Sequence, residues 1–258
     1  MSQLKVTTVV PAYNEGDGLS AFLRALATEG LACRSVTVSV IVVDDGSDAE
    51  HEAQQRAGVE AAAAVLSAAG SAHRISYLRS PQNQGKGASI RLGWSRADGD
   101  ADWLGFIDAD GAVPAREYWR VATMLPAASA DAVCGSRVKM AGREVERSLF
   151  RHLQGRVFAT FAEEIFHLGF YDTQCGFKFF CGNLLRPILP RLTETRWLLD
   201  LEVLDLLRSS GARFAEVPID CYQQRGGSSL VFGIDPLKMA LRLFSLKRRL
   251  RQHEDAAR

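Results

Sequence analysis

The stretch WLGFIDADGAVP, residues 103–114, starts as an unbroken run of apolar and small residues and then reaches two aspartates, Asp108 and Asp110. A run that is apolar at every position is typical of a strand buried on both faces of a parallel sheet. Polar groups directly after such a strand lie at the edge where open parallel sheets bind ligands. We therefore interpret this stretch as a buried strand that leads into a functional site.

Strand-like and helix-like patterns alternate through the first half of the chain, and a helix-rich second half follows. This βαβα order predicts an α/β fold: a Rossmann-like, mostly parallel sheet with helices on both faces. We expect residues 1–235 to form one domain and residues 236–258 to form a basic amphipathic helix and tail. The predicted strands are residues 6–11, 36–47, 75–79, 103–108 and 213–220. The predicted helices are residues 19–30, 52–70, 87–97, 196–211 and 235–258, together with a long amphipathic helix into which the basic stretch from residue 135 opens and which ends at about Leu168.

The composition excludes several classes of protein. The 258 residues carry 31 Lys and Arg against 30 Asp and Glu, so no overall field would attract a nucleic acid, and we predict no nucleic-acid partner. The five cysteines form no C-x-x-C pair, which argues against a zinc site or a disulfide framework. We find neither a signal-peptide pattern nor an apolar window of about 18 residues, so we expect a cytoplasmic protein, soluble or peripherally attached to a membrane.

The aspartate pair after the strand suits a divalent cation. Mg²⁺ and Mn²⁺ prefer oxygen ligands, and they are commonly held by one or two protein carboxylates together with substrate phosphate oxygens. We therefore predict that Asp108 and Asp110 bind Mg²⁺ or Mn²⁺, which would bridge to a diphosphate. Taken alone, two aspartates in this spacing are more typical of a solvated loop or a helix cap.

Two upstream strand ends carry groups suited to a nucleotide. Tyr13 offers an aromatic face, Glu15 an acceptor for ribose hydroxyls and Asp44 an acceptor for a base N–H, with Asp45 beside it. Lys86 precedes a helix whose N-terminal amides would face a phosphate. The alternatives are a surface aromatic side chain for Tyr13 and a turn or cap for Asp45.

A basic stretch follows the aspartate pair. Guanidinium groups suit bidentate phosphate recognition, and four arginines lie within fifteen residues. A solvated helix face is the alternative. The four residues are Arg137, Arg143, Arg147 and Arg151.

Several motifs, in this order and spacing, resemble glycosyltransferase family 2, the inverting GT-A enzymes. They are VVPAYNE, IVVDDGSD, NQGKG, DADG and GSR. More narrowly, RSLFR, DTQCGFKFF, RWLLDLEVL and AEVPID are similar to the dolichyl-phosphate glucosyltransferases and their relatives, which are cousins of dolichyl-phosphate mannose synthase. Where mannose synthases have Gln two residues after the second metal Asp, this chain has Ala112, which weakens the mannose-synthase assignment.

The resemblance implies a GT-A fold and the transfer of a sugar from a nucleotide sugar, UDP-glucose or else GDP-mannose, to a polyprenyl phosphate with inversion. It places the DTQC segment by the sugar, with Asp172 and Gln174 as contacts. By motif, the nucleoside would be held by Pro11, Tyr13, Glu15 and Asp44, the metal by Asp108 and Asp110, and the acceptor phosphate by Arg137 and Arg151, with Arg147 on the same helix face as Arg151.

A phosphate acceptor determines what catalysis requires. A phosphate monoester carries about 1.5 to 2 negative charges at neutral pH and needs no strong base to act as a nucleophile. Catalysis would then depend on neutralising the departing diphosphate, by the metal and by Lys86 or Arg225. If the acceptor were a soluble hydroxyl compound, a general base would be needed; Asp172 is the first candidate and Glu202 the second, although Asp172 also suits a structural cap.

The C-terminal segment bears on the membrane. One face of its predicted helix carries Met239, Leu243, Leu246 and Leu250, and basic residues surround that face. Such a helix lies in a lipid interface or packs on the domain with snorkelling basic side chains. We thus expect an enzyme at the cytoplasmic face of a membrane, and keep a hydroxyl acceptor and a non-catalytic nucleotide-sugar-binding protein as alternatives. The sequence does not predict the oligomeric state.

Overall fold

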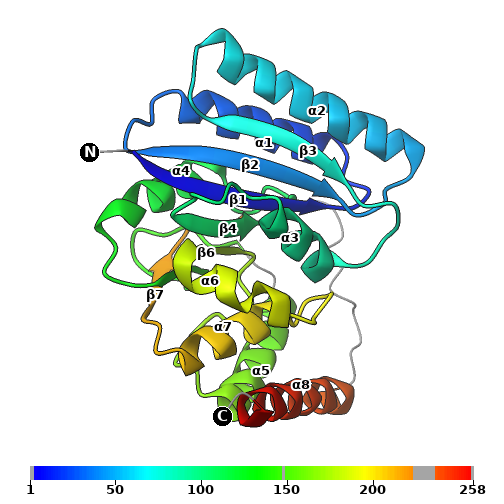
Figure 1. The fold of residues 1–258 in the computed structure, drawn as a ribbon, viewed down its shortest axis with the longest axis vertical. Helices are drawn as coiled ribbons and strands as arrows, with labels where there is room; N and C mark the ends of the chain where they lie inside the picture. The colour runs from blue at the N-terminus through cyan, green and yellow to red at the C-terminus, as the bar shows by residue number, and fades with distance from the viewer. Residues whose placement is uncertain (1–2, 147–148, 223–235, 257–258) are drawn as a thin grey trace.

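One seven-stranded sheet, in the order β3-β2-β1-β4-β6-β5-β7, forms the centre of the fold (Figure 1). The computed structural model describes residues 3–146, 149–222 and 236–256, without the side chains of 149–154, 236–239 and 253–256. All neighbouring strands are parallel except β6, which lies antiparallel between β4 and β5. The strands are β1 (Leu4–Ala12), β2 (Val36–Asp44), β3 (Arg74–Arg79), β4 (Trp103–Ile107), β5 (Ala132–Ser136), β6 (Phe177–Cys181) and β7 (Phe214–Pro218). The predicted α/β class with a mostly parallel sheet is confirmed.

Helices cover both faces of the sheet, as predicted. One hydrophobic cluster joins α1, α2 and α4 to one face, and a second joins α3, α5, α6, α7 and α8 to the other. In Figure 1, α1 and α2 lie at one end of the molecule, and α5, α7 and α8 lie at the opposite end. The helices are α1 (Asp17–Gly30), α2 (Ala49–Ala68), α3 (Lys86–Ser95), α4 (Ala115–Met124), α5 (Leu149–Phe166), α6 (Gly182–Ile188), α7 (Leu199–Ser209) and α8 (Pro236–Ala256), with short 3-10 turns at Leu125–Ala127 and Leu189–Arg191.

The central strands are apolar at successive positions because both faces of the sheet are covered. In β1, Val6 and Val10 belong to one buried cluster, whereas Val9 belongs to the other. Successive side chains of a strand point to opposite faces, so a strand buried on both sides must be apolar throughout. The same reasoning explains β4, whose five residues are all buried.

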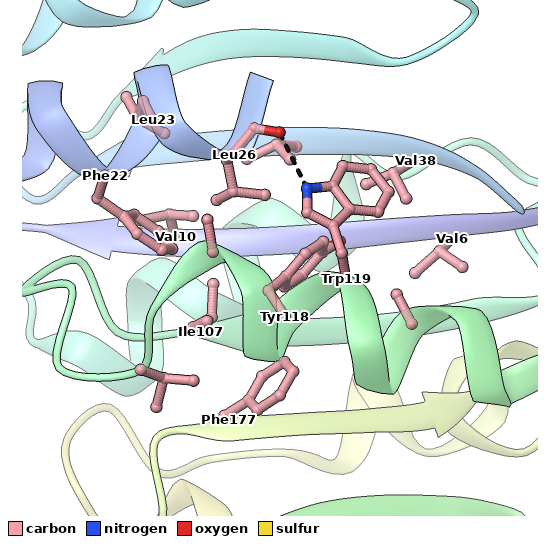
Figure 2. Close-up of a cluster of buried hydrophobic side chains, with 14 of the residues drawn as sticks. Val6, Val10, Phe22, Leu23, Leu26, Val38, Ile107, Tyr118, Trp119 and Phe177 are labelled. Carbon is pink, nitrogen blue, oxygen red and sulfur yellow. Dashed lines mark hydrogen bonds between the residues drawn. The ribbon is translucent and has the colours of Figure 1, made fainter. Parts of the chain in front are cut away.

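Helix α4, which follows the loop with the aspartate pair, is anchored to the rest of the fold by two buried aromatic side chains. The Tyr118 hydroxyl lies 2.7 Å from Thr8 Oγ1 of β1, and the indole Nε1–H of Trp119 donates to the Leu26 carbonyl of α1 at 2.9 Å (Figure 2). Both aromatic side chains are buried in the cluster that Figure 2 shows. Because β4 and α4 are both anchored, the residues between them, 108–114, connect two fixed points.

The C-terminal helix α8 packs against the protein. Leu243, Leu246 and Leu250 are buried in the cluster that also contains residues of α5 and α7, while the side chain of Met239 lies outside the described residues. Of the two alternatives for this apolar face, packing on the domain is therefore the one that the structure has. The face predicted to lie in lipid is not available to a membrane.

Candidate active site

Polar side chains from the ends of β1 and β4 meet at one edge of the sheet. These strands are parallel neighbours, so their carboxyl ends lie side by side. Glu15 follows β1 and Asp108 follows β4, and burial and the charges of Asp110 and Asp108 raise the pKa of Glu15. Tyr13, after β1, has 49% of its surface exposed and is therefore accessible at this edge, while Pro11 lies within β1.

The aspartate pair is held close together. The Asp108 N–H donates to the Gly176 carbonyl at 2.9 Å, and Asp110 Oδ1 accepts from the Ala112 N–H at 2.9 Å. Burial and the neighbouring charge of Asp108 raise the pKa of Asp110. The two carboxylates are thus near enough for the charge of one to act on the other, and their binding of a shared cation stays a prediction.

Lys86, the first residue of α3, supplies positive charge to this pair. Its Nζ lies 2.5 Å from Asp108 Oδ1, and the two side chains are 36% and 38% exposed. Burial acts to lower the pKa of Lys86, but the charges of Asp108 and Asp200 and the hydrogen bond to Asp108 together outweigh it, and the pKa is raised. The preceding Gly85 has φ +104°, a conformation that glycine adopts readily, and it turns the chain into the helix.

The donor set at Asp108 and Asp110 fits a hard cation only in part. Within residues 3–146, 149–222 and 236–256, no group of three or more His, Cys, Asp or Glu side chains could hold a metal ion. Two carboxylates suffice for Mg²⁺ or Mn²⁺ when substrate oxygens and water complete the shell. The pair therefore fits a cation that arrives with a diphosphate, and it does not form a cage that would retain a cation by itself.

The two carboxylates at the end of β2, Asp44 and Asp45, are buried and bonded within the protein. Asp45 accepts the N–H groups of Gln84 and Gly85 at 3.0 and 2.7 Å, so it holds the loop that leads into α3. Asp44 accepts from the Tyr77 hydroxyl at 2.7 Å and from Arg79 at 3.2 Å. Both residues shape the donor side of the site, and their direct contact with a donor stays a prediction.

Arg137 and Asp172 form a two-pronged ion pair. Asp172 accepts from Arg137 Nε at 2.7 Å and Nη2 at 2.8 Å, and from the Arg137 backbone N–H at 3.1 Å. Glu216 of β7 accepts the N–H groups of Tyr171 and Asp172, which fixes the loop. Burial alone would raise the pKa of Asp172, but Arg137 holds it well below its ordinary value. A carboxylate that binds protons so weakly, and whose two oxygens both accept hydrogen bonds from Arg137, is poorly suited to act as a general base.

The segment after Asp172 carries site features that the sequence analysis missed. A Cβ on Gly176 would lie 1.9 Å from Asp108 Oδ2, so only glycine allows the close approach of this carboxylate. Lys178 of β6 is fully buried, and its Nζ donates to the Cys175 carbonyl at 2.6 Å and to Asp200 at 2.8 Å. The signal for Lys178 was available, because a lysine inside the apolar run GFKFF needs a buried partner.

Three buried polar atoms around Arg137 have no hydrogen-bond partner within the described part of the chain. They are Ser136 Oγ, Thr173 Oγ1 and Gln174 Nε2. Buried polar atoms usually have hydrogen-bond partners, so these three protein atoms are available to hydrogen-bond a substrate or a bound water. The predicted contact of Gln174 with the sugar stays a prediction, and Ser136 and Thr173 join it as candidates.

Some predicted residues are placed elsewhere or are not described. Arg143 pairs with Glu117 and Asp220 on the side of α4, so it stabilises the fold there. Glu202 accepts from the N–H groups of Thr193 and Glu194, which opposes its role as a general base. The predictions for Arg147 and Arg225, and for the side chain of Arg151, lie outside the described residues.

The chain is similar in sequence to known glycosyltransferases. Residues 7–188, more than half of the chain, match the profile of Glycosyl transferase family 2. A dolichyl-phosphate beta-glucosyltransferase of Trichomonas vaginalis is 30% identical over 257 residues, which cover 95% of this chain and 71% of that protein. One of Dictyostelium discoideum is 27% identical, with 94% and 72% covered.

The fold is similar to solved structures. The crystal structure of glucosyl-3-phosphoglycerate synthase from Mycobacterium tuberculosis with Mn²⁺, UDP and glucosyl-3-phosphoglycerate has a TM-score of 0.62 at 17% identity. The match covers 96% of this chain and 80% of that one. At this identity the likeness shows the GT-A fold alone.

We predict that Gly176→Ala weakens binding of Mn²⁺ in the presence of UDP by about tenfold or more, because the added methyl group must displace the Asp108 carboxylate. Calorimetry measures the affinity, and the melting temperature reports whether the fold is retained. Gly18→Ala is the matched control, since a Cβ there meets nothing within 4 Å. A folded Gly176→Ala protein that binds Mn²⁺ as tightly as the wild type contradicts the prediction.

We predict that Asp172→Asn lowers the free energy of unfolding by about 3 kcal/mol at neutral pH, because it leaves Arg137 without its buried partner. The pKa of Asp172 is lower in the folded state than its ordinary 3.8, so the stability from this pair is present above that value and is lost as the pH falls toward the folded value. The difference between wild type and variant should therefore narrow on acidification. Urea unfolding at neutral and acidic pH measures it.

Asp131→Asn is the matched control for this measurement. Asp131 accepts from the backbone N–H, Nε and Nη2 of Arg213, the same three kinds of group, but the Arg213 side chain is 68% exposed against 19% for Arg137. Exposed pairs contribute less, so its loss should be smaller. Equal losses in the two variants would mean that burial of the Arg137–Asp172 pair is not what stabilises the loop.

Proposed function

The chain belongs to glycosyl transferase family 2 and is a glycosyltransferase, and from this premise we propose that it moves glucose from UDP-glucose to a polyprenyl phosphate with inversion. The relatives reported above are named for glucose transfer to dolichyl phosphate over nearly the whole length of this chain. The observation that carries the choice of acceptor is the Arg137–Asp172 pair. It provides a fixed guanidinium at the site and, in Asp172, a carboxylate unsuited to act as a base.

The acceptor side follows from the geometry of Arg137. Asp172 uses the Nε and Nη2 groups of the guanidinium, which leaves Nη1 directed elsewhere for a phosphate oxygen. Asp172 and Glu216 fix the direction of this side chain, so its orientation need not be set when the acceptor binds. The acceptor phosphate is already anionic and attacks without transferring a proton to the enzyme. Arg147 and Arg151 stay proposed partners for the same phosphate.

The donor side must stabilise a departing diphosphate. A divalent cation held by Asp108 and Asp110 would neutralise charge on the diphosphate oxygens. Lys86, at the N-terminus of α3, adds a positive charge, whereas the Ala88 N–H of this helix end already donates to the Thr195 carbonyl. Tyr13, Glu15 and Asp44 are the proposed nucleoside contacts. Direct attack by the acceptor from the opposite side of the sugar inverts the anomeric carbon, and it requires no covalent intermediate with the enzyme.

The reaction is tested with purified protein, radiolabelled UDP-glucose, Mn²⁺ and a short polyprenyl phosphate, with polyprenol as the matched hydroxyl acceptor. We expect an organic-extractable product with the phosphate and none with polyprenol, and a loss of that product in Asp110→Asn. Transfer to polyprenol would overturn the phosphate acceptor, and turnover only with GDP-mannose would overturn the donor. A reaction unaffected by chelation of divalent cations would overturn the role of the metal.

We further propose that the enzyme attaches peripherally to a membrane surface, at its cytoplasmic face, through the outer face of α8. None of the described helices is both long and apolar enough to cross a bilayer. Leu241 and Phe244 are each 60% exposed on α8, and Arg248 and Arg251 share their side of the helix. Exposed apolar groups interspersed with arginine favour the interface of anionic lipids.

Other basic residues of α8 have partners in the protein. Lys247 donates to Asp205 at 2.7 Å, and Arg249 pairs with Glu194, so these two anchor the helix to the domain. The proposed membrane face is therefore narrower than the basic content of the helix suggests. It lies away from the buried leucines that the sequence analysis singled out.

We predict that the double variant Leu241→Ser, Phe244→Ser binds vesicles containing anionic lipid about tenfold more weakly, because two exposed apolar side chains no longer enter the interface. Sedimentation with vesicles measures binding. Met124→Ser, which removes a 46% exposed apolar side chain from α4, is the control and should bind like the wild type. Equal binding by the wild type and the double variant would place the membrane contact elsewhere.

A further inference from the structure

Access of a cation to Asp108 is contested from two sides. Oδ2 lies against Gly176, where even a Cβ would be only 1.9 Å away. Oδ1 is taken by Lys86 Nζ at 2.5 Å. Both oxygens of the first aspartate thus have a close neighbour, although its side chain is 38% exposed. Asp110, in contrast, forms no ion pair with any described residue. A cation that uses both carboxylates has to replace Lys86.

The backbone at Asp108 is held in place, so the short Asp108 side chain has little reach away from Lys86. Its N–H is bonded to the Gly176 carbonyl, and β4 is paired with β6 up to the preceding residue, Ile107, opposite Phe177. The two side chains are about equally exposed, at 36% and 38%, but Lys86 reaches the pair with the far end of a longer and more flexible side chain. When a cation arrives, the lysine is the partner that can move.

Among the described residues, the protein interior near Lys86 offers its ammonium group no second ion-pair partner. Lys86 Nζ lies 5.6 Å from the centre of the Phe106 ring, and Lys178 Nζ lies 5.5 Å from the same ring. Asp200, a buried carboxylate whose charge acts on Lys86, is already bonded to Lys178 at 2.8 Å. Repulsion from the Lys178 ammonium opposes movement of a second ammonium inward. A displaced Lys86 therefore turns outward, toward the place where the diphosphate binds in the proposed function.

We propose that Lys86 is an exchangeable counter-ion, which occupies Asp108 in the free enzyme and passes to the donor diphosphate when a divalent cation takes its place. The inference rests on the proposed function for the identity of the donor. It makes the lysine the element that couples the binding of cation and nucleotide, beyond the direct attraction between the two. Such coupling is reciprocal: each ligand raises the affinity of the other by the same factor.

This role differs measurably from that of a lysine that always faces the phosphates. A permanent phosphate ligand contributes to UDP binding with and without the cation. An exchangeable lysine contributes only when the cation has released it from Asp108. In addition, it competes with the cation when no nucleotide is present, so its removal should strengthen binding of the cation alone.

The experiment is calorimetry with three titrations: Mn²⁺ alone, UDP alone, and UDP at saturating Mn²⁺. For Lys86→Met we expect tighter binding of Mn²⁺ alone by about fivefold or more, unchanged binding of UDP alone, and weaker binding of UDP with Mn²⁺ by about tenfold. Lys86→Gln should behave alike and serves if the methionine variant does not fold. Lys86→Arg, which keeps the charge, should retain most of the coupling.

Lys5→Met is the matched control. Lys5 also pairs with an aspartate, Asp100, but at the amino end of β1, the opposite end of the strand from the site. Its loss changes the net charge by the same amount and should leave all three titrations unchanged. This excludes a general effect of protein charge on Mn²⁺ affinity.

The outcomes separate the two proposals. If Lys86→Met binds Mn²⁺ alone no more tightly than the wild type, or loses UDP affinity equally with and without Mn²⁺, the exchange is refuted while the proposed function stands. If wild-type protein binds neither UDP nor UDP-glucose with Mn²⁺ present, the proposed donor fails, and the exchange fails with it. The expected pattern in both methionine and glutamine variants, absent in Lys5→Met, supports the exchange.

Discussion

The site depends on one antiparallel strand in an otherwise parallel sheet. Because β6 runs between β4 and β5 in the opposite direction, the segment just before it crosses the carboxyl ends of both neighbours. Gly176 bonds to Asp108 after β4, and Asp172 bonds to Arg137 after β5. A single segment of five residues, 172–176, thereby sets the positions of the proposed donor and acceptor groups relative to each other. A change in this segment would disturb both sides at once.

In the part of the chain that the structure describes, some charged side chains of the site are neutralised by a partner, whereas two carboxylates are not. The unneutralised carboxylates are the ones available to a ligand. Lys178 and Asp200 neutralise each other in the interior, and Arg137 and Asp172 do so beside the site. Glu15 and Asp110 form no ion pair within the described residues, and burial raises the pKa of each. Negative charge without a partner, held by a rigid frame, attracts a cation with little reorganisation. Lys86 differs from these neutralised pairs, since it is paired with Asp108 but remains partly exposed.

The C-terminal helix α8 has one face buried against the domain and one exposed face. Its inner leucines complete the core with α5 and α7, and Lys247 and Arg249 bind carboxylates of the domain. Its outer face keeps Leu241 and Phe244 exposed. This outer face is the part of α8 that the proposed function places against a bilayer.

The sequence by itself determined the α/β class, the parallel strands and the meeting of Glu15, Asp108 and Asp110 at one edge, because unbroken apolar runs and the polar residues that end them are local features. It also indicated Arg137 as a phosphate ligand. Only the tertiary structure decided that Asp172 pairs with Arg137, that Gly176 lies against Asp108 and that Leu243 faces the core. These contacts join residues distant in the chain, and they depend on the direction of β6 and on which face of α8 is covered, which no local pattern of residues specifies.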